Sequence, residues 1–474
     1  MDGVTGDGEK QAMPAGGEPA GGAPEAEAQG TGETHLTLAQ AMDLAVGMHR
    51  RGMLDAAEEL YRRILAVEPE NVDALHLLGL SRHLRKDTDG ALELVRRAVT
   101  LAPGHVDAVS NLGNLLLERG DLSGAEQAYR RALELRPDFA NAQANLGIAL
   151  RRADDLPGAE AALRRAIELD PKHGAAHHNL GTVLFDSGRT IEALTEYQQA
   201  LALMPYDGDS YRRVGATLYA MGRIDEAGAV YQRWLSLEPD NPIAQHMVAA
   251  ASGDGIPARA SDEFVQSTFD SFAGSFDAVL GRLLYKAPQL VADAVAARLE
   301  QAPEVATPTR DVLDVGAGTG LCGPLLRPYA RRLVGIDLSK GMLDKARERG
   351  VYDALEVAEL TAYLTAPEQA AAYDLIVSAD TLVYLGDLGT AFAGAAAAAR
   401  PQALLVFTVE RLEDDDPEGP VRLMPHGRYA HSEAYVRAAL GAAGFGEIET
   451  ARVQPRTENR VPVDGLLVSA RRVS

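Results

Sequence analysis

The small and apolar positions of the chain recur every 34 residues between about residues 36 and 252. Prolines at this interval are Pro69, Pro103, Pro137, Pro171, Pro205 and Pro239. Glycines in the same register are Gly79, Gly113, Gly147, Gly181 and Gly215, and alanines are Ala57, Ala91, Ala125, Ala159, Ala193 and Ala227. Small residues allow two helices to touch, and a proline cannot continue a helix. The pattern therefore predicts six helical hairpins.

This period resembles that of the tetratricopeptide repeat, a helical hairpin of 34 residues. The resemblance implies an all-α superhelix over residues 36–252, in which residues 241–252 cap the last apolar face. The concave groove of such a superhelix, lined by the first helix of each unit, is expected to bind a peptide or protein partner.

Asparagines recur at one position of the expected groove, at Asn111, Asn145 and Asn179. Stacked amides can donate to and accept from the backbone of an extended peptide, so these residues are candidate partner-binding residues. Asparagine at this position can equally bond to a neighbouring helix, and both interpretations stay open.

Short apolar runs separated by helical segments replace the repeats after about residue 300. Val312, Leu313 and Val315 form the first run. Further runs lie at residues 333–336, 355–358, 374–379 and 404–409, expected helices at 321–330, 341–349 and 431–443, and an antiparallel pair at 447–453 and 465–471. Runs of this kind suit strands that are buried on both faces. The pattern predicts a doubly wound α/β domain.

Composition adds a third region, because residues 1–35 are rich in Gly, Ala, Pro and Glu and hold seven acids against one base. Such a segment buries too little apolar surface to offset its ordering entropy, so we expect a disordered acidic tail. The 474 residues exceed one ordinary core. The expected order is the tail, repeats at 36–252, a linker at 253–260 and the α/β domain at 261–474.

The net charge of -22 opposes docking on polyanions, so we expect no nucleic acid and no anionic membrane as partner. Cys322 is the single cysteine, which rules out an intramolecular disulfide and a cysteine-based zinc site; no metal is expected. The chain has no apolar run of membrane-spanning length and no signal-peptide pattern. These features predict a cytoplasmic protein.

A glycine turn with two flanking acids lies where the first strand should end. DVGAGTG places Gly316, Gly318 and Gly320 after the strand and Asp314 two residues before the first glycine. Glycines let a ligand approach the main chain, and Asp337, at the end of the second strand, is positioned for ribose hydroxyls. The spacing GxGxG differs from the dinucleotide fingerprint, and the Asp314 carboxylate would repel a diphosphate. A nucleoside that carries a cation is therefore favoured.

DVGAGTG with IDLS resembles motifs I and II of class I S-adenosylmethionine-dependent methyltransferases. The resemblance implies a Rossmann-like fold with a seven-stranded, mostly parallel sheet and S-adenosyl-L-methionine as cofactor. Beyond the glycines and the two acids, it assigns cofactor binding to Leu338, Met342, Glu359 and Asp380. Glu359 would accept from the adenine amino group, and Asp380 would lie at the strand edge that abuts the methyl group.

Residues 269–277, FDSFAGSFD, resemble the lid helices of small-molecule methyltransferases, with Phe269, Phe272 and Phe276 at the matching positions. Repeats followed by this domain resemble a bacterial family of tetratricopeptide-repeat methyltransferases. The resemblance implies the cofactor but not the methyl acceptor.

Methyl transfer from a sulfonium depends on alignment of the nucleophile more than on acid–base help. Candidate catalytic residues are Tyr384, His431 and Glu410, and Arg428 or Arg460 is positioned to hold a carboxylate. These residue types also serve as structural hydrogen bonders at the ends of strands and helices.

The leading hypothesis is an S-adenosylmethionine-dependent methyltransferase whose repeats recruit a protein partner or substrate. One alternative is a non-catalytic scaffold whose methyltransferase-like domain only binds the cofactor. Another is a peptide-binding adaptor whose C-terminal domain acts on an unrelated small molecule.

Overall fold

Residues 38–252 form helices at the interval that the repeat period predicts. The computed structural model describes residues 36–270, 273–458 and 461–473, so the predicted acidic tail and Arg460 lie outside the described residues. The chain divides into two units, one up to Leu115 and one from Leu116 onward.

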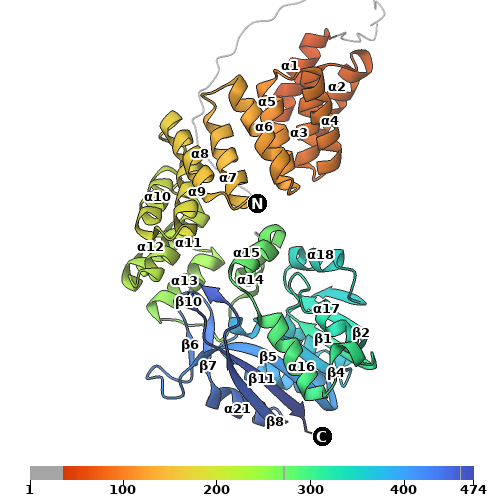
Figure 1. The fold of residues 1–474 in the computed structure, drawn as a ribbon, viewed down its shortest axis with the longest axis vertical. Helices are drawn as coiled ribbons and strands as arrows, with labels where there is room; N and C mark the ends of the chain where they lie inside the picture. Colours follow the sequence, from red (N-terminus) through yellow and green to blue (C-terminus); the bar gives the residue numbers. More distant parts are fainter. Residues whose placement is uncertain (1–35, 271–272, 459–460, 474) are drawn as a thin grey trace, which may run out of the picture. The chain divides into compact units, whose positions relative to one another are not determined.

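Each hairpin consists of two helices of similar length. The first helices are α1 (Leu38–Arg50), α3 (Val72–Leu84), α5 (Val106–Glu118), α7 (Ala140–Arg152), α9 (Gly174–Asp186) and α11 (Gly208–Ala220). The second helices are α2 (Leu54–Val67), α4 (Thr88–Leu101), α6 (Leu122–Leu135), α8 (Leu156–Leu169), α10 (Thr190–Leu203) and α12 (Ile224–Leu237), and α13 (Pro242–Ser252) follows them. These helices, labelled in Figure 1, confirm the tetratricopeptide-type fold.

The repeat glycines lie where the two helices of a hairpin touch. A Cβ atom on Gly147 would lie 2.5 Å from Cγ of Leu163, and one on Gly181 would lie 2.7 Å from Cδ1 of Tyr197. Leu163 and Tyr197 are fully buried in the second helices. No larger residue fits at these two glycines, which is the steric reason that the sequence pattern suggested.

The α/β domain is built on a sheet whose main path has seven strands, as predicted. The strands are β1 (Arg310–Val315), β2 (Ala330–Asp337), β3 (Ala354–Val357), β4 (Tyr373–Ser378), β5 (Ala399–Leu412), β8 (Phe445–Val453) and β11 (Gly465–Arg472), in the order β3-β2-β1-β4-β5-β11-β8. Neighbours from β3 to β5 are parallel, and β11 is antiparallel to β5 and β8. Two short strands, β6 (Val421–Leu423) and β7 (Tyr429–Ser432), add to the sheet beside β5.

Helices cover both faces of this sheet. The α-helices of this domain are α14 (Asp262–Asp270), α15 (Phe276–Arg282), α16 (Ala287–Leu299), α17 (Gly323–Leu326), α18 (Lys340–Glu348), α19 (Leu360–Thr365), α20 (Gly389–Ala398) and α21 (Glu433–Ala442). Val312 of β1 packs with Val295 of α16, whereas the next residue, Leu313, belongs to a core with Phe392 of α20. Alternate strand residues thus enter opposite cores, as a doubly wound sheet requires.

Two predicted helices are shorter than the sequence pattern suggested. The expected helix at residues 321–330 is only α17, because Pro328 has no N–H to donate to a preceding turn and the chain continues as a short 3₁₀ turn at Arg327–Tyr329. The expected helix at 431–443 begins at Glu433, since residues up to Ser432 pair with β5 as β7. Within the described residues, no helix has the length and apolar character needed to cross a bilayer.

Residues 253–260, the expected linker, are joined to the α/β domain by backbone bonds. Arg259 forms an antiparallel bridge with Leu385. The amide of Ala260 donates to the carbonyl oxygen of Tyr384 at 2.8 Å, and the amide of Gly386 donates to that of Ala258 at 2.9 Å. The segment therefore runs beside residues 384–386 as a short strand would.

Helix α13 also packs against the α/β domain. Nε2 of His246 donates to the carbonyl oxygen of Gly427 at 2.8 Å, and its ring lies 4.0 Å from that of Phe264, centroid to centroid. Ala249 and Ala250 share a buried cluster with Tyr429 of β7 and Leu423 of β6. The last helix of the repeat region thus contributes to the core of the domain that follows it.

Candidate functional site

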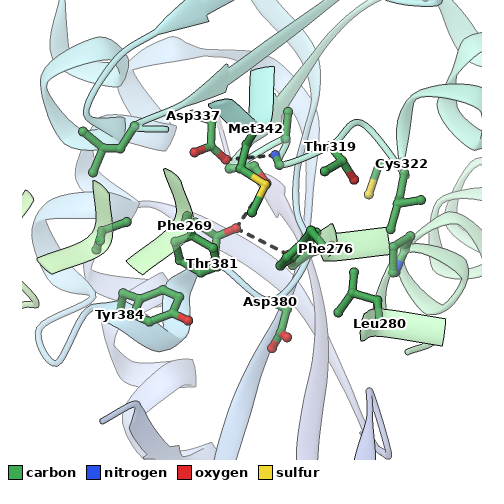
Figure 2. Close-up of a pocket in the computed structure, with 18 of the residues that line it drawn as sticks. Phe269, Phe276, Leu280, Thr319, Cys322, Asp337, Met342, Asp380, Thr381 and Tyr384 are labelled. Carbon is green, nitrogen blue, oxygen red and sulfur yellow. Dashed lines mark hydrogen bonds between the residues drawn. The ribbon is translucent and has the colours of Figure 1, made fainter. Parts of the chain in front are cut away.

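A cavity of about 280 Å³ lies at the carboxyl ends of β1, β2 and β4. Its wall includes Gly316 after β1, Asp337 at the end of β2, and Asp380 after β4. Ligands of doubly wound folds bind at this edge of the sheet, and the volume is near the lower end of the range for small-molecule sites. Figure 2 shows Asp337 and Met342 on one side of the cavity and Asp380 and Tyr384 on the other.

The glycine turn holds Asp337 in place through its main chain. Gly316 and Gly318 have φ angles of 74° and 55°, which side-chain-bearing residues rarely adopt. The amide of Gly318 donates to Oδ2 of Asp337 at 2.9 Å, and the amide of Ser339 donates to Oδ1 at 2.8 Å. No atom lies within 4 Å of where a Gly318 Cβ would be. The turn thus presents main chain and a fixed carboxylate together.

Asp314 does not line the cavity. It lies at the end of β1 with 1% of its surface exposed, and Oδ2 accepts a bond of 2.6 Å from the hydroxyl of Tyr352. Burial raises the pKa of Asp314 to about 7, and the Tyr352 bond opposes that rise only in part. Gly320 also faces Tyr352, since a Cβ there would lie 3.0 Å from its Cε2. Asp314 and Gly320 are brought together behind the turn, beside Tyr352.

The other predicted cofactor residues divide between the cavity and its surroundings. Leu338 and Met342 line the wall, and Met342 is buried in the first turn of α18. Glu359 does not line it: its carboxylate accepts from the amide of Ala362 at 2.7 Å and caps the N-terminus of α19. Glu359 and Ala362 are three residues apart, as in an ordinary side-chain cap.

Aromatic rings from three segments form one wall of the cavity. Phe269 and Phe276 meet edge to face with centroids 6.0 Å apart, and Phe269 meets Tyr384 in the same way at 5.6 Å. All three residues line the cavity, as does Leu280 of α15 (Figure 2). Phe272, the third predicted lid aromatic, lies outside the described residues. An apolar ligand group against this wall would be shielded from water.

A network of five charged residues closes the cavity near Asp380. Arg456, 4% exposed, bonds to the carboxylates of Asp380, Glu410 and Glu458. Nε of Arg428 lies 2.9 Å from Oε1 of Glu410, and its Nη2 contacts Glu458. Two arginines therefore face three carboxylates, and neither arginine is available as an anion clamp without breaking these pairs.

The network sets the ionisation of its members. Burial alone would raise the pKa of Glu410, but the bond to His426 and the charges of Arg428 and Arg456 hold that pKa well below its usual range. For Asp380 burial prevails over Arg456, so its pKa is raised. Asp380 also adopts a left-handed φ of 61°, held by a bond of 2.9 Å from its amide to Oγ1 of Thr408. A non-glycine residue in this conformation marks a constrained position.

Of the three candidate catalytic residues, only Tyr384 lines the cavity. Glu410 does not line the cavity, but it forms ion pairs with Arg428 and Arg456, which do. His431 is fully buried in β7, donates from Nε2 to the carbonyl oxygen of Gly386 at 3.2 Å, and has its pKa lowered to about 4 by burial. The helix end at which the sequence pattern put His431 is a strand, which turns its ring into the core.

The repeat asparagines have local partners. Nδ2 of Asn111 donates to Nε2 of His76, in the first helix of the preceding repeat, at 2.9 Å. Nδ2 of Asn179 donates to the carbonyl oxygen of Ala175 at 2.8 Å. Asn145 and Asn179 are half-buried at equivalent positions of successive repeats. The Asn111 bond is the neighbouring-helix arrangement that the sequence left open.

Several residues of the site were not expected from the sequence. Arg456 and Glu458 lie in a loop and a two-residue strand, where charged side chains usually point to solvent. Tyr352 follows α18 and meets Asp314 only through the tertiary fold. The sequence does point to Asp270 and Asp277 as residues near the cavity, because each directly follows one of the phenylalanines of the cavity wall.

Two family models match the chain. The model described as "Cilia and flagella-associated protein 70 C-terminal domain" matches residues 9–269, which is more than half of the chain. The model described as "Methyltransferase domain" matches residues 312–402. The second match extends from β1 into β5 and so contains the glycine turn, Asp337 and Asp380.

Three relatives resemble part of the chain, among them a human protein and a bacterial one. The human methyltransferase-like protein 27 is 38% identical over 93 residues, 19% of this chain and 36% of that protein. The ubiquinone biosynthesis O-methyltransferase of Bordetella avium (strain 197N) is 28% identical over 148 residues, 28% of this chain and 59% of that protein. The chain thus spans between 36% and 59% of the length of these two relatives.

Among solved structures, the crystal structure of PilW, a widely conserved type IV pilus biogenesis factor, is 20% identical to the matched part of the chain. The match covers 44% of this chain and 96% of PilW, with a TM-score of 0.42.

Proposed function

The chain belongs to the family described as the cilia and flagella-associated protein 70 C-terminal domain and carries a methyltransferase domain after its repeats, and on this premise we propose that it is an S-adenosylmethionine-dependent methyltransferase whose repeats bind the protein that is, or presents, the methyl acceptor. The observation that carries the proposal is the joint presence of the glycine turn and the fixed Asp337 carboxylate in one cavity wall.

The chemistry of the wall fits this cofactor. Asp337 offers a carboxylate to ribose hydroxyls, and Leu338 and Met342 offer an apolar surface to a purine. Arg428 and Arg456 line the cavity but are paired with carboxylates, so neither offers an unpaired positive charge to a diphosphate. Aromatic rings suit a sulfonium, because a cation is attracted to the face of a π system. When bound, S-adenosylmethionine supplies an activated methyl group.

The chain's own contribution to transfer is alignment and exclusion of water. The wall formed by Phe269, Phe276 and Tyr384 shields the cavity, and the Arg456 network fixes Asp380 at its end. Burial raises the pKa of Tyr384, although Arg428 and Arg456 act against this, so its hydroxyl stays neutral near pH 7. A neutral phenol can orient an acceptor by hydrogen bonding, which is the kind of help that transfer from a sulfonium needs.

Binding of S-adenosylmethionine, measured by calorimetry, tests the cofactor. Loss of a hydrogen-bonded carboxylate costs about 1.5–3 kcal/mol, so Asp337→Ala should weaken binding by about tenfold or more. Asp344→Ala removes the same charge from a half-buried position on α18 that does not line the cavity, and it is the matched control. Unchanged affinity in Asp337→Ala, or binding of NAD in its place, would contradict the proposal.

Polar side chains on the first helices of the later repeats support recruitment of a partner. Nε2 of His178 lies 3.0 Å from Oδ2 of Asp209, and Arg212 pairs with the same carboxylate. Asn179 is adjacent to His178 on α9, one repeat before Asp209 and Arg212. Peptide grooves of repeat proteins present such groups to backbone amides and carbonyls.

Transfer of labelled methyl groups in a lysate tests recruitment. The full chain is compared with a variant carrying both Asn145→Ala and Asn179→Ala, after equal affinity for S-adenosylmethionine has been established. We expect label in a protein fraction with the parent chain and several-fold less with the variant. Equal labelling by both proteins would contradict partner binding through these asparagines.

A further inference from the structure

The dipeptide Phe-Asp occurs twice beside the cavity, and in both cases the phenylalanine and the aspartate make different contacts. Phe269 and Phe276 line the cavity, while Asp270 and Asp277, the residues that follow them, bond to elements that carry the cofactor-binding groups. The aromatic wall and its attachment to the sheet domain are therefore encoded side by side.

Asp270 holds the N-terminal end of α18. Its Oδ1 accepts from the amide of Gly341 at 3.2 Å and from the hydroxyl of Ser339. Ser339 is the N-cap of α18, and its own amide donates to Asp337 at 2.8 Å. A single serine thus connects the carboxylate beside Phe269 with the carboxylate of the cavity wall. A negative charge at a helix N-terminus is also favoured by the helix dipole.

Asp277 holds the other end of α18 and the glycine turn together. Its Oδ1 accepts from the hydroxyl of Thr319 at 2.5 Å, and its Oδ2 pairs with Arg349, the C-cap of α18. Nε of Arg349 donates in turn to the carbonyl oxygen of Thr319 at 2.6 Å. These three bonds form a closed ring between the turn, the end of α18 and α15.

Close packing supports the same docking. A Cβ atom on Gly341 would lie 3.2 Å from Cβ of Ala273 and 3.3 Å from Oδ1 of Asp270. The second residue of α18 therefore has no side chain at the point where Asp270 and Ala273 pack against it.

We propose that Asp270 and Asp277 are positioning residues for cofactor binding. By bonding to the two ends of α18, they hold the rings of Phe269 and Phe276 in the cavity wall. The inference rests on the proposed function, because it takes S-adenosylmethionine as the ligand of this cavity. A preformed wall lowers the entropy cost of binding, so loss of either aspartate weakens binding although neither carboxylate lines the cavity.

The test measures the affinity of the full chain for S-adenosylmethionine by calorimetry. Asp270→Ala and Asp277→Ala are each expected to weaken binding about tenfold, the scale of one lost charge-assisted hydrogen bond. Asp344→Ala, on the same helix and paired only with Lys340 and Arg347 in the described structure, should leave affinity within about twofold. Asp270→Asn keeps an acceptor oxygen for Ser339 and Gly341 and should restore most of the affinity.

Combining Asp270→Ala with Phe269→Ala distinguishes a positioning role of Asp270 from a general loss of stability. Phe269→Ala should weaken binding in the parent chain but add little in the Asp270→Ala background, because the ring is already displaced there. Additive losses would overturn the inference, as would parent-like affinity in both aspartate variants. Failure of the parent chain to bind S-adenosylmethionine would instead refute the proposed function.

Discussion

The hydroxyl of Tyr352 donates a hydrogen bond of 2.6 Å to Oδ2 of Asp314, a carboxyl group that is 1% exposed at the end of β1. This bond lies behind the glycine turn, outside the cavity wall. The sequence predicts a direct electrostatic role for Asp314 toward a cation in the cavity. Such a role would have to act through the turn, because Asp314 does not line the cavity.

The first prediction concerns the pH dependence of stability through Asp314. Burial raises its pKa to about 7 from 3.8. Between these values the folded chain keeps a proton that the unfolded chain has released, so the free energy of unfolding falls as pH rises. In Asp314→Asn this fall is absent. We expect the variant to gain up to about 4 kcal/mol relative to the parent chain between pH 4 and pH 8.

Urea unfolding at a series of pH values measures this difference. Tyr352→Phe is the companion variant: the Tyr352 bond lowers the pKa of Asp314, so its loss should extend the fall in stability to higher pH. A stability difference between Asp314→Asn and the parent that stays constant with pH would show that Asp314 is ionised in the folded chain.

The second prediction concerns the Arg456 network. Arg456→Met leaves the carboxylates of Asp380, Glu410 and Glu458 without their shared cation in a buried site. Removing one partner of a buried ion pair costs about 3–5 kcal/mol. Arg452→Met, whose side chain is 67% exposed and 3.8 Å from Glu413, should change stability by less than about 0.5 kcal/mol. Equal melting temperatures for the two variants would contradict a structural role for the network.

Much of the fold could be predicted from the sequence, because its determinants are local or periodic. The spacing of Gly147 and Gly181 reflects contacts that repeat in every hairpin, and the glycine turn and Asp337 are positioned by the strands they end. Pairings between distant charged residues could not be predicted. Arg456 meets Glu410 across 46 residues, and only the tertiary fold brings the two side chains together.

Two predicted site residues illustrate the same limit. Glu359 has a capping position three residues before Ala362, a local alternative that prevails in the structure over a cavity-facing orientation. His431 was assigned to a helix end, but pairing of β7 with β5 extends the strand through that position and buries the ring. Both outcomes depend on the residue at which a helix or strand begins. A sequence pattern predicts such boundaries less accurately than it predicts the helices and strands themselves.

The third prediction tests the packing of a repeat hairpin. Gly147→Ala places a Cβ atom 2.5 Å from Cγ of the buried Leu163 and should destabilise the chain by about 1–3 kcal/mol. Gly228→Ala, in α12, meets only Cβ of Ala251 at an ordinary 3.5 Å and should be neutral or stabilising by up to about 1 kcal/mol through helix propensity. Thermal unfolding of both variants checks the contrast, and a stable Gly147→Ala would contradict the tight contact.

The fourth prediction concerns the contact of α13 with the α/β domain. His246→Ala removes the bond to the carbonyl oxygen of Gly427 and the ring contact with Phe264. A buried carbonyl without its partner costs about 1–3 kcal/mol. Hydrogen exchange should show faster exchange around residues 424–428 in the variant. His105→Ala, whose half-buried ring pairs with Asp73 in the first unit of the chain, is the control and should leave these amides unchanged.

The backbone pairing of residues 258–260 beside Tyr384 has a consequence for protein engineering. A chimera that receives a foreign repeat array by splicing within residues 253–260 would disturb the backbone pairing beside Tyr384, a residue of the cavity wall. A splice at the turn before Pro242 would instead keep α13 and everything after it in native register. The interchangeable part of this protein therefore ends one helix earlier than its repeat boundary suggests.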